Sequence, residues 1–413
     1  MIRFKTQELD NGLKVILHQD PSSALTHVNL LYNVGAKDED PERTGFAHLF
    51  EHLMFSGSKK APNFDLIVDR MGGENNAFTN NDITNYYISI PNNQLSNALW
   101  LESDRVHNLN INQKSLDVQK NVVIEEFKQR YLNQPYGDLW ALIRDLSYKQ
   151  HPYRWPTIGK DISHIEDASL EDVRAFYQKH YQPSNAVLCL SGNIDLIQAQ
   201  DLVEEHFSEL SNQSFSKPAL IQEPLQTEPR YKTVEREVPQ SAIIVSFLMS
   251  SRLDPLYHAY DFLSDLLSNG KSSRFYQSLV KDQELFTDIN AFITGDTDQG
   301  LFVIIGRLRE DVEMSRAEEL IWKELDRLNH EEISDYEFNK VKNKFKTTHS
   351  LSNLKALNRA MNLSYFQNLG DANLINTDLD TYTSLNQEDI INLAKERFQK
   401  KYSNTLYYLG IKS

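Results

Sequence analysis

Two histidines and a glutamate stand among apolar residues in the stretch GFAHLFEHLMFSG, which runs from Gly45 to Gly57. His48 and His52 are four residues apart, and Glu51 directly precedes the second histidine. If the stretch is helical, residues three and four apart lie on one face, so the three polar groups span an arc of about 100°. Burying three polar groups on an otherwise apolar helix is costly unless a partner compensates them. Any fold of this chain must therefore supply a partner to that face.

A metal ion is one such partner. Two neutral imidazole nitrogens can bind Zn²⁺, and a glutamate between them can take a proton from water without being a ligand. The order H-x-x-E-H is the reverse of the commoner H-E-x-x-H. The alternative is a pair of buried histidines satisfied by ordinary hydrogen bonds. Because 12 histidines in 413 residues rarely give this spacing by chance, the sequence favours the metal hypothesis.

A further carboxylate lies in a helical pattern predicted over residues 116–131. The stripe at three- and four-residue spacing consists of Gln119, Val122, Val123, Glu126 and Phe127. Glu126 thus occupies a position where an apolar residue is expected, whereas Glu125 is rotated by about 100° toward solvent. Zinc with two imidazole ligands needs a third protein ligand, which Glu126 can provide. A salt bridge between Glu126 and a core arginine is the alternative, and the pattern alone does not decide between them.

Charge and cysteine content exclude several functions. The formal net charge of −15 disfavours nucleic acid and anionic membrane as partners. The one cysteine, Cys189, lies in an apolar run and cannot form an internal disulfide. The N-terminus lacks an apolar signal core, and no stretch reaches the ~20 apolar residues of a membrane span. We therefore expect a cytoplasmic protein, or a periplasmic or organellar one if a targeting segment has been removed.

The chain is too long for one ordinary core and is expected to form two domains. Residues 212–230 contain three prolines without periodicity and predict a linker between domains at 1–211 and 231–413. The two parts resemble each other: Glu171-Asp-Val leads to an apolar strand ending at Gly192, and Glu388-Asp-Ile leads to one ending at Gly410. The strand and helix around residues 28–57 have a counterpart at 242–267, where HAYDFLSDLL lacks the histidine pair. This similarity predicts a duplicated domain.

HLFEH, followed further on by VVIEEF, resembles the pitrilysin-like inverzincin zinc metallopeptidases, especially the half-length branch that includes subunits of mitochondrial processing peptidase. Further matches are DNGLKV, GGENNAFTNNDITNYY, HPYRWPTIG, YQPSNAVLCLSG and SSRFYQ, so the resemblance covers most of the chain. It implies His48, His52 and Glu126 as zinc ligands and Glu51 as general base. It also implies a zinc-bearing catalytic domain at 1–211 and a degenerate, non-metal-binding homologous domain at 231–413.

The fold implied by the resemblance is α+β: two homologous α/β-sandwich domains, each a mixed sheet packed by helices, which enclose a chamber. Asn75 to Pro91 reads as a strand, either an ordinary half-buried one or one at a sheet edge. In the family, an Asn-Ala pair on an edge strand holds the substrate backbone. This assigns substrate contact to Asn76 and Ala77, with Phe78 near the leaving-side pocket, and strand addition would select extended peptides.

Two departures from the family pattern bear on activity. Gln119 stands where the family often has an acidic residue that supports the metal. Lys281 and Thr287 stand where active members carry an Arg and a Tyr that contact substrate. We therefore expect a zinc endopeptidase that forms a heterodimer with a homologous chain supplying Arg and Tyr, or a homodimer in which Lys281 serves. The alternative is a weakly active or inactive scaffold or peptide-binding subunit.

Overall fold

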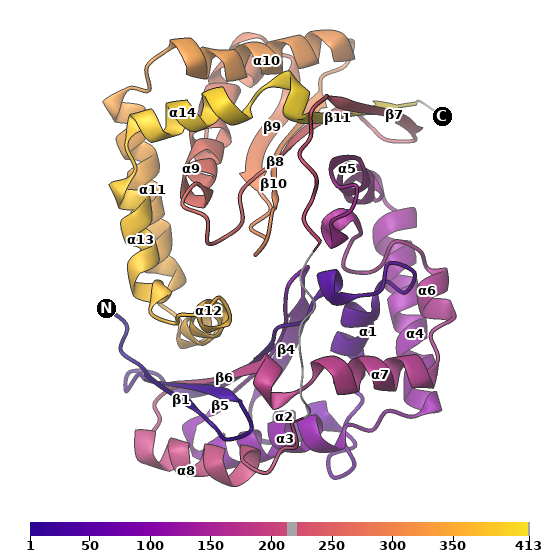
Figure 1. Ribbon diagram of the computed structural model, residues 1–413, viewed down its shortest axis with the longest axis vertical. Coiled ribbons are helices and arrows are strands. Elements are labelled where there is room, and N and C mark those ends of the chain that lie inside the picture. The colour runs from indigo at the N-terminus through magenta and orange to yellow at the C-terminus, as the bar shows by residue number, and fades with distance from the viewer. Residues whose placement is uncertain (213–220, 412–413) are drawn as a thin grey trace. The chain divides into compact units, whose positions relative to one another are not determined.

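The structure is a computed structural model that describes residues 1–212 and 221–411. These residues form two compact units (Figure 1). Unit 1 comprises residues 1–128, 155–212 and 350–377, and unit 2 comprises residues 129–154, 221–349 and 378–411. Of the predicted linker, residues 213–220 lie outside the described residues, and residues 221–229 belong to unit 2.

Unit 1 is built on a six-stranded mixed sheet with the order β1-β2-β6-β3-β5-β4. The strands are β1 (Lys5–Glu8), β2 (Lys14–Gln19), β3 (Leu25–Tyr32), β4 (Glu74–Thr79), β5 (Thr84–Pro91) and β6 (Ala186–Gly192). β2 and β6 run parallel, and all other neighbours are antiparallel. β4 is the edge strand beside β5.

The strand predicted over Asn75 to Pro91 is two strands, so that prediction was wrong in its extent. The Asn80 side chain accepts hydrogen bonds from the backbone N–H groups of Asp82 and Ile83, at 2.8 Å each. Such a side-chain turn competes with the ladder and reverses the chain. The reversal makes β4 an edge strand and leaves β5 inside the sheet.

Helices cover both faces of the unit 1 sheet. α12 (Ala356–Asn368) packs on β3 and β6, where Ala360 and Leu363 join Ile16, Val187 and Cys189 in one buried cluster. α3 (Leu95–Asn108) and α8 (Leu196–Phe207) contact the sheet from the opposite side (Figure 1). The remaining helices of this unit are α1 (Phe46–Leu53), α2 (Phe64–Arg70), α4 (Gln113–Phe127), α6 (Ser163–Glu166) and α7 (Leu170–His180).

Unit 2 has a five-stranded mixed sheet in the order β7-β11-β8-β10-β9. The strands are β7 (Arg230–Arg236), β8 (Ala242–Leu248), β9 (Phe286–Ile293), β10 (Leu301–Leu308) and β11 (Ser403–Gly410). On one face, Ile243, Val245 and Phe247 are buried with residues of α9 (Tyr257–Ser268), α10 (Met314–His330) and α14 (Gln387–Arg397). On the other, Ala242 and Ile244 are buried with α5 (Leu139–Ser147). Two buried faces explain why β8 is apolar at every position except Ser246.

The two units are not continuous in sequence. α5 precedes the predicted linker yet belongs to unit 2, and α12 follows it yet belongs to unit 1. A single boundary at residues 212–230 therefore does not separate the compact units. The physical reason is that each sheet has a second apolar face to bury, and α5 and α12 supply the cover.

The two sheets share one topology, as the internal similarity predicts. Strands β2-β6-β3-β5-β4 of unit 1 correspond in order and direction to β7-β11-β8-β10-β9 of unit 2, with one parallel pair at the same place. The helices before β6 and β11 begin with the same capping box, formed by Ser169 with Asp172 and by Asn386 with Asp389. The helix after β3 is α1 and the helix after β8 is α9, so α9 is the counterpart of the H-x-x-E-H helix.

Two further predictions concern single residues and spans. Cys189 is buried on β6 and is a free cysteine, as expected. Among the described residues, no helix has the length and apolar character needed to cross a bilayer.

Candidate metal centre

α1 carries the H-x-x-E-H motif, and its N-terminus is held by an unusual cap. Gly45 precedes the helix with φ 90°, and a Cβ there would lie 2.6 Å from the carbonyl oxygen of Ile158. The residue is therefore restricted to glycine, which has no side chain for capping. Glu39 supplies the cap instead, because its carboxylate accepts hydrogen bonds from the N–H groups of Gly45 (2.9 Å) and Ala47 (2.8 Å).

Glu39 is a buried carboxyl group beside the start of α1. Burial raises its pKa to about 8, against the opposing effect of the hydrogen bonds from Ala47, Gly45 and Trp155. The two hydrogen bonds that it accepts satisfy N–H groups that a helix N-terminus would otherwise leave unpaired. This role of Glu39 was not predicted from the sequence; the available signal was an acidic residue shortly before a helix that is preceded by glycine.

The apolar face of α1 is fixed by aromatic packing on α7. The ring of Phe50 stacks on Phe176 at 5.2 Å and on Tyr177 at 5.9 Å, and lies 5.0 Å from Tyr181. Phe46 is also buried and lies 6.1 Å from Phe176. This packing sets the rotation of α1, so the side of the helix that carries His48 and His52 is held in one direction.

Glu126 lies in the last turn of α4, which packs beside α1. A π-helical turn, η3 (Lys128–Leu132), follows directly. The side chain of Glu126 is 19% exposed, whereas that of Glu125 is 64% exposed and pairs with Lys128 at 2.8 Å. The stripe predicted for α4 is only partly buried, because Val123 is buried but Val122 is 43% exposed. The structure thus places the two neighbouring glutamates on different sides of α4, with Glu126 toward α1.

His48, His52 and Glu126 converge on one point. The two Nε2 atoms lie 3.4 Å apart, and Oε2 of Glu126 lies 3.7 Å from Nε2 of His48 and 3.4 Å from Nε2 of His52. Tetrahedral zinc with bonds of about 2.0–2.1 Å would separate its ligand atoms by about 3.3–3.4 Å. The three donors therefore fit zinc in chemistry and in spacing. Within residues 1–212 and 221–411, no other trio of His, Cys, Asp or Glu gathers its ligand atoms in this way.

Glu51 stands on α1 next to His52 and is outside this trio. It lies near a pair of buried phenols, Tyr86 on β5 and Tyr181 after α7, whose hydroxyl oxygens are 2.9 Å apart. Burial raises the pKa of both phenols, and the negative charge of Glu51 adds to the rise. Neutral phenols are thus held in the wall beside Glu51, and no feature of the sequence predicted them there.

Arg105, a buried arginine beside Tyr86, pairs with a carboxylate other than that of Glu126. Arg105 on α3 is 1% exposed and binds the carboxylate of Glu102, with Nε and Nη2 at 3.0 Å and 2.6 Å from the two oxygens. Its guanidinium also lies over the rings of Phe64 (4.4 Å) and Tyr86 (4.8 Å). The buried Arg105–Glu102 pair thus packs against Tyr86 and helps to hold this phenol in place beside α1.

The predicted substrate residues lie on the edge strand β4. Asn76, Ala77 and Phe78 pair with Tyr87, Tyr86 and Asn85 of β5. The N–H of Ala77 points away from β5 and donates to the side-chain oxygen of Asn76 at 2.8 Å. Phe78 is 39% exposed and lines a hollow of about 310 Å³. The hollow is bounded by uncharged residues: Leu31, Asn80, Ile83, Asn85, Ser352, Asn358, Met361, Asn362 and Tyr365 join Phe78.

Three further positions named from the sequence, Gln119, Lys281 and Thr287, are not part of the trio. Gln119 is half-buried on α4. Lys281 belongs to unit 2, on the π-helical segment η6 (Tyr276–Asp282), and its Nζ donates to Gln277 at 3.1 Å. Thr287 lies on the edge strand β9 and donates to the side chain of Gln240 at 3.2 Å.

Comparison with known proteins identifies the family. Residues 14–138, which include α1 and Glu126, match the family model of insulinase (peptidase family M16), and residues 167–345 match that of the M16 inactive domain. The chain is a half-length member of the M16 peptidase family. Zinc protease PqqE of Helicobacter pylori is 29% identical over 98% of this M16 chain and 92% of its own length. An uncharacterised zinc protease of Bacillus subtilis, YmxG, is 24% identical over 98% of both chains.

Solved M16 structures share the fold. The crystal structure of a protease from Helicobacter pylori superposes with a TM-score of 0.93 at 27% identity, covering 99% of this chain and all of that one. Pitrilysin superposes with a TM-score of 0.82 at 17% identity, over 99% of this chain but 45% of its own. This M16 chain therefore corresponds to about half of pitrilysin.

Proposed function

We propose that this chain is a zinc endopeptidase that hydrolyses extended or unfolded peptides. The observation that carries the proposal is the convergence of His48, His52 and Glu126 at the spacing of tetrahedral zinc ligands. Three protein ligands leave a fourth position open, which is the arrangement of catalytic rather than structural zinc. The names of the zinc protease relatives support the same assignment.

Glu51 is the general base in this proposal. Zn²⁺, when bound, supplies Lewis acidity that polarises a carbonyl oxygen and makes water more acidic. Glu51 takes the proton from the attacking water and passes it to the nitrogen of the leaving amine. Its place beside His52, yet outside the ligand trio, supports a role in proton transfer and not in metal binding.

The edge of β4 positions the substrate. An extended peptide that adds to this edge would use main-chain hydrogen bonds and replace the Asn76 side chain at the N–H of Ala77. The released amide of Asn76 could then bind the peptide backbone. The uncharged hollow beside Phe78 suits an uncharged substrate side chain, because it offers no counter-charge to a lysine or a glutamate.

Metal content and peptide cleavage test the proposal together. The purified chain should hold about one zinc. Glu51→Gln should retain the zinc and lower hydrolysis by about 10²–10⁴. Glu126→Gln should lose zinc and hydrolysis together. Release of zinc by Glu51→Gln as complete as by Glu126→Gln would show that the roles of base and ligand are misassigned.

A partner chain is part of the proposal. Lys281 and Thr287 give unit 2 neither the arginine nor the tyrosine that the family resemblance associates with substrate contact. Because losing one donor to a developing charge costs about 10²–10³ in rate, the isolated chain should cleave slowly. A homologous chain that supplies Arg and Tyr should raise turnover by a similar factor; in a homodimer Lys281 must serve. Fast cleavage by a demonstrated monomer or homodimer, unaffected by Lys281→Ala, would contradict the need for a complementing subunit.

The second candidate function is a scaffold or peptide-binding subunit without useful activity. The match of residues 167–345 to the M16 inactive domain favours it for the second half of the chain. A single-turnover assay with enzyme in excess separates the two, because a scaffold gives no cleavage even with the homologous partner present.

A further inference from the structure

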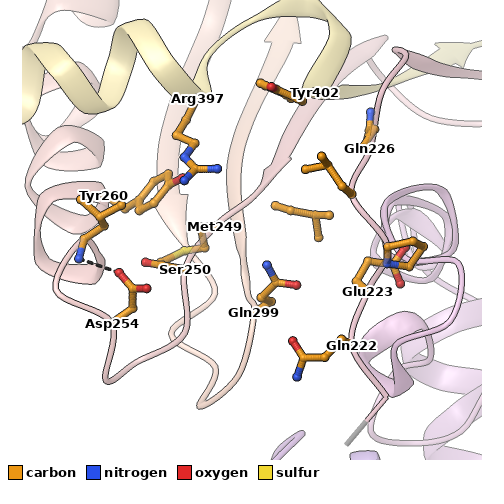
Figure 2. Close-up of a pocket in the computed structure, with 14 residues that line it drawn as sticks. Gln222, Glu223, Gln226, Met249, Ser250, Asp254, Tyr260, Gln299, Arg397 and Tyr402 are labelled. Carbon is orange, nitrogen blue, oxygen red and sulfur yellow. Dashed lines mark hydrogen bonds between the residues drawn. The ribbon is translucent and has the colours of Figure 1, made fainter.

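Unit 2 contains a hollow of about 330 Å³ that is separate from the metal centre. Figure 2 shows the extended segment with Gln222, Glu223 and Gln226 on one side, and Tyr260 and Arg397 on the other. Met249 and Ser250, just after β8, lie between them. The volume of the hollow is at the lower end of the range of about 300–1,000 Å³ for small-molecule sites, which fits a ligand of amino-acid size.

The extended side of the hollow is firmly held. The carboxylate of Glu223 accepts hydrogen bonds from three successive backbone N–H groups, those of Lys149 (2.7 Å), Gln150 (2.9 Å) and His151 (2.9 Å). The side-chain nitrogen of Gln226 donates to the carbonyl oxygen of Ser403 at 2.9 Å. Both side chains are buried. The hollow is thus a preformed feature of unit 2, which lowers the entropic cost of binding.

Several polar atoms around the hollow have no hydrogen-bond partner among the described residues. They are Oγ of Ser250, Oε1 of Gln226 and Nε of Arg397, and each is shielded from solvent. Buried donors and acceptors are nearly always paired, and a group left unpaired has lost its hydration without compensation. Three such atoms around one hollow indicate that a polar ligand completes the site.

Arg397 is the one cationic side chain among the described residues that line the hollow, and it favours an anionic group of the ligand at its own end, apart from the carboxylates of Glu223 and Asp254. Glu223 is already engaged by three N–H groups, and Oδ1 of Asp254 accepts the N–H of Leu256 at 2.8 Å. Within the part of the chain that the structure describes, the guanidinium of Arg397 forms one ion pair, at 3.2 Å with the 66% exposed Glu396, and exposed pairs of this kind contribute little. Arg397 therefore keeps donors available for a carboxylate.

Apolar side chains line the rest of the hollow and favour a ligand with an aliphatic part. Leu248, Met249, Leu256 and the exposed Leu225 line the hollow next to these polar groups. We infer that the hollow binds an aliphatic α-amino carboxylate, either a free apolar amino acid or the C-terminal residue of a short peptide. Arg397 and Ser250 would bind its carboxylate, Gln226 would accept from its N–H group, and the leucine and methionine side chains would cover its aliphatic part.

The inference does not depend on peptidase activity. The residues of the metal trio belong to unit 1, whereas the hollow is formed by unit 2 alone. Binding can be measured on the full-length chain carrying Glu51→Gln, so that a peptide ligand is not consumed. A failure of zinc chemistry would then leave the binding result unchanged.

Isothermal titration with three probes tests the chemistry. Leucine and Leu-Leu carry the carboxylate, and leucine amide has the same aliphatic part without it. We expect saturable binding of leucine, Leu-Leu or both with a stoichiometry near one, and binding of leucine amide weaker by about 10- to 100-fold. Preference for leucine would identify a free amino acid as the ligand, and preference for Leu-Leu would identify a peptide end. Binding of no probe, or equal binding of leucine amide, would overturn the inference.

Two variants tie the binding to this hollow. Arg397→Gln should weaken binding of the carboxylate probe by about 10- to 100-fold, and Ser250→Ala should weaken it by a smaller factor. Arg316→Gln is the matched control, because Arg316 is an exposed α10 arginine that pairs with the exposed Glu319 at 2.8 Å. Unchanged affinity in both Arg397→Gln and Ser250→Ala would place the binding elsewhere and overturn the assignment. If one of the two variants folds poorly, unchanged affinity in the other has the same meaning.

Discussion

Helices α1 and α9 occupy the same place in two sheets of the same topology, yet their polar residues are used differently. On α1, His48 and His52 point to one place, where Glu126 of α4 meets them. On α9, three polar residues have separate partners: His258 pairs with Asp378 (2.9 Å), Asp261 with Tyr382 (2.6 Å) and Asp265 with Lys344 (2.8 Å). The same fold thus makes a candidate metal centre when its donors converge, and ordinary pairs when they are dispersed.

The largest expected difference between the two helices is in zinc binding. His52→Ala removes one of the three proposed ligands and should reduce zinc from about one per chain to nearly none, as measured by mass spectrometry of metal content. His258→Ala is the matched control on α9 and should leave zinc unchanged. Equal loss in both variants would mean that zinc binding reflects the general integrity of the fold and not the trio on α1.

The second-largest expected difference is in the stability lost when the cap at the start of each helix is removed. Glu39→Ala leaves the N–H groups of Gly45 and Ala47 without their acceptor, which costs about 1–3 kcal/mol for each group that remains buried and unpaired. Asp254→Ala before α9 removes the acceptor of one N–H group, that of Leu256, and should cost less. Urea unfolding of the two variants measures this difference; a smaller loss for Glu39→Ala would show that α1 does not need its buried cap.

The contribution of Asp261 on α9 to folding stability should depend on pH. Burial raises its pKa to about 6, while the bond to Tyr382 opposes the rise and Asp265 adds to it; His258 and Lys344 also lower it. The folded state therefore holds the proton more tightly than the unfolded state between about pH 4 and pH 6. This contribution is present below that window and is lost as the pH rises through 6.

Asp261→Asn removes this titration. Two pKa units correspond to about 3 kcal/mol, which is the upper bound on the change. The urea midpoint of the variant, relative to that of the native chain, should be higher at pH 8 than at pH 4. The same difference at both pH values would contradict a raised pKa for Asp261.

The smallest effect is expected at Glu125, beside the proposed ligand. Glu125 pairs with Lys128 on the surface, so Glu125→Gln should change stability by less than about 1 kcal/mol and leave zinc content unchanged. Glu126→Gln, one residue away, should release the metal. Loss of zinc from Glu125→Gln would show that the two glutamates had been assigned in the wrong order.

The sequence by itself determined the features that depend on local spacing. The four-residue interval between His48 and His52 places both imidazoles on one helix face wherever the helix packs. The duplication was predicted in part from Glu171-Asp-Val and Glu388-Asp-Ile, short motifs that lie in the capping boxes before β6 and β11 and act within one turn of helix. The burial of Cys189 followed from an apolar run that suits a strand covered on both faces.

Only the tertiary structure decided which distant elements meet. Glu126 reaches the histidines because α4 packs beside α1, and Glu39 caps α1 from the loop that precedes the helix. The covers of the two sheets, α12 and α5, come from the opposite parts of the chain. A helix of either origin can bury the same apolar surface, because the hydrophobic effect is not directional; the sequences of α5 and α12 therefore do not specify the sheet that each one covers.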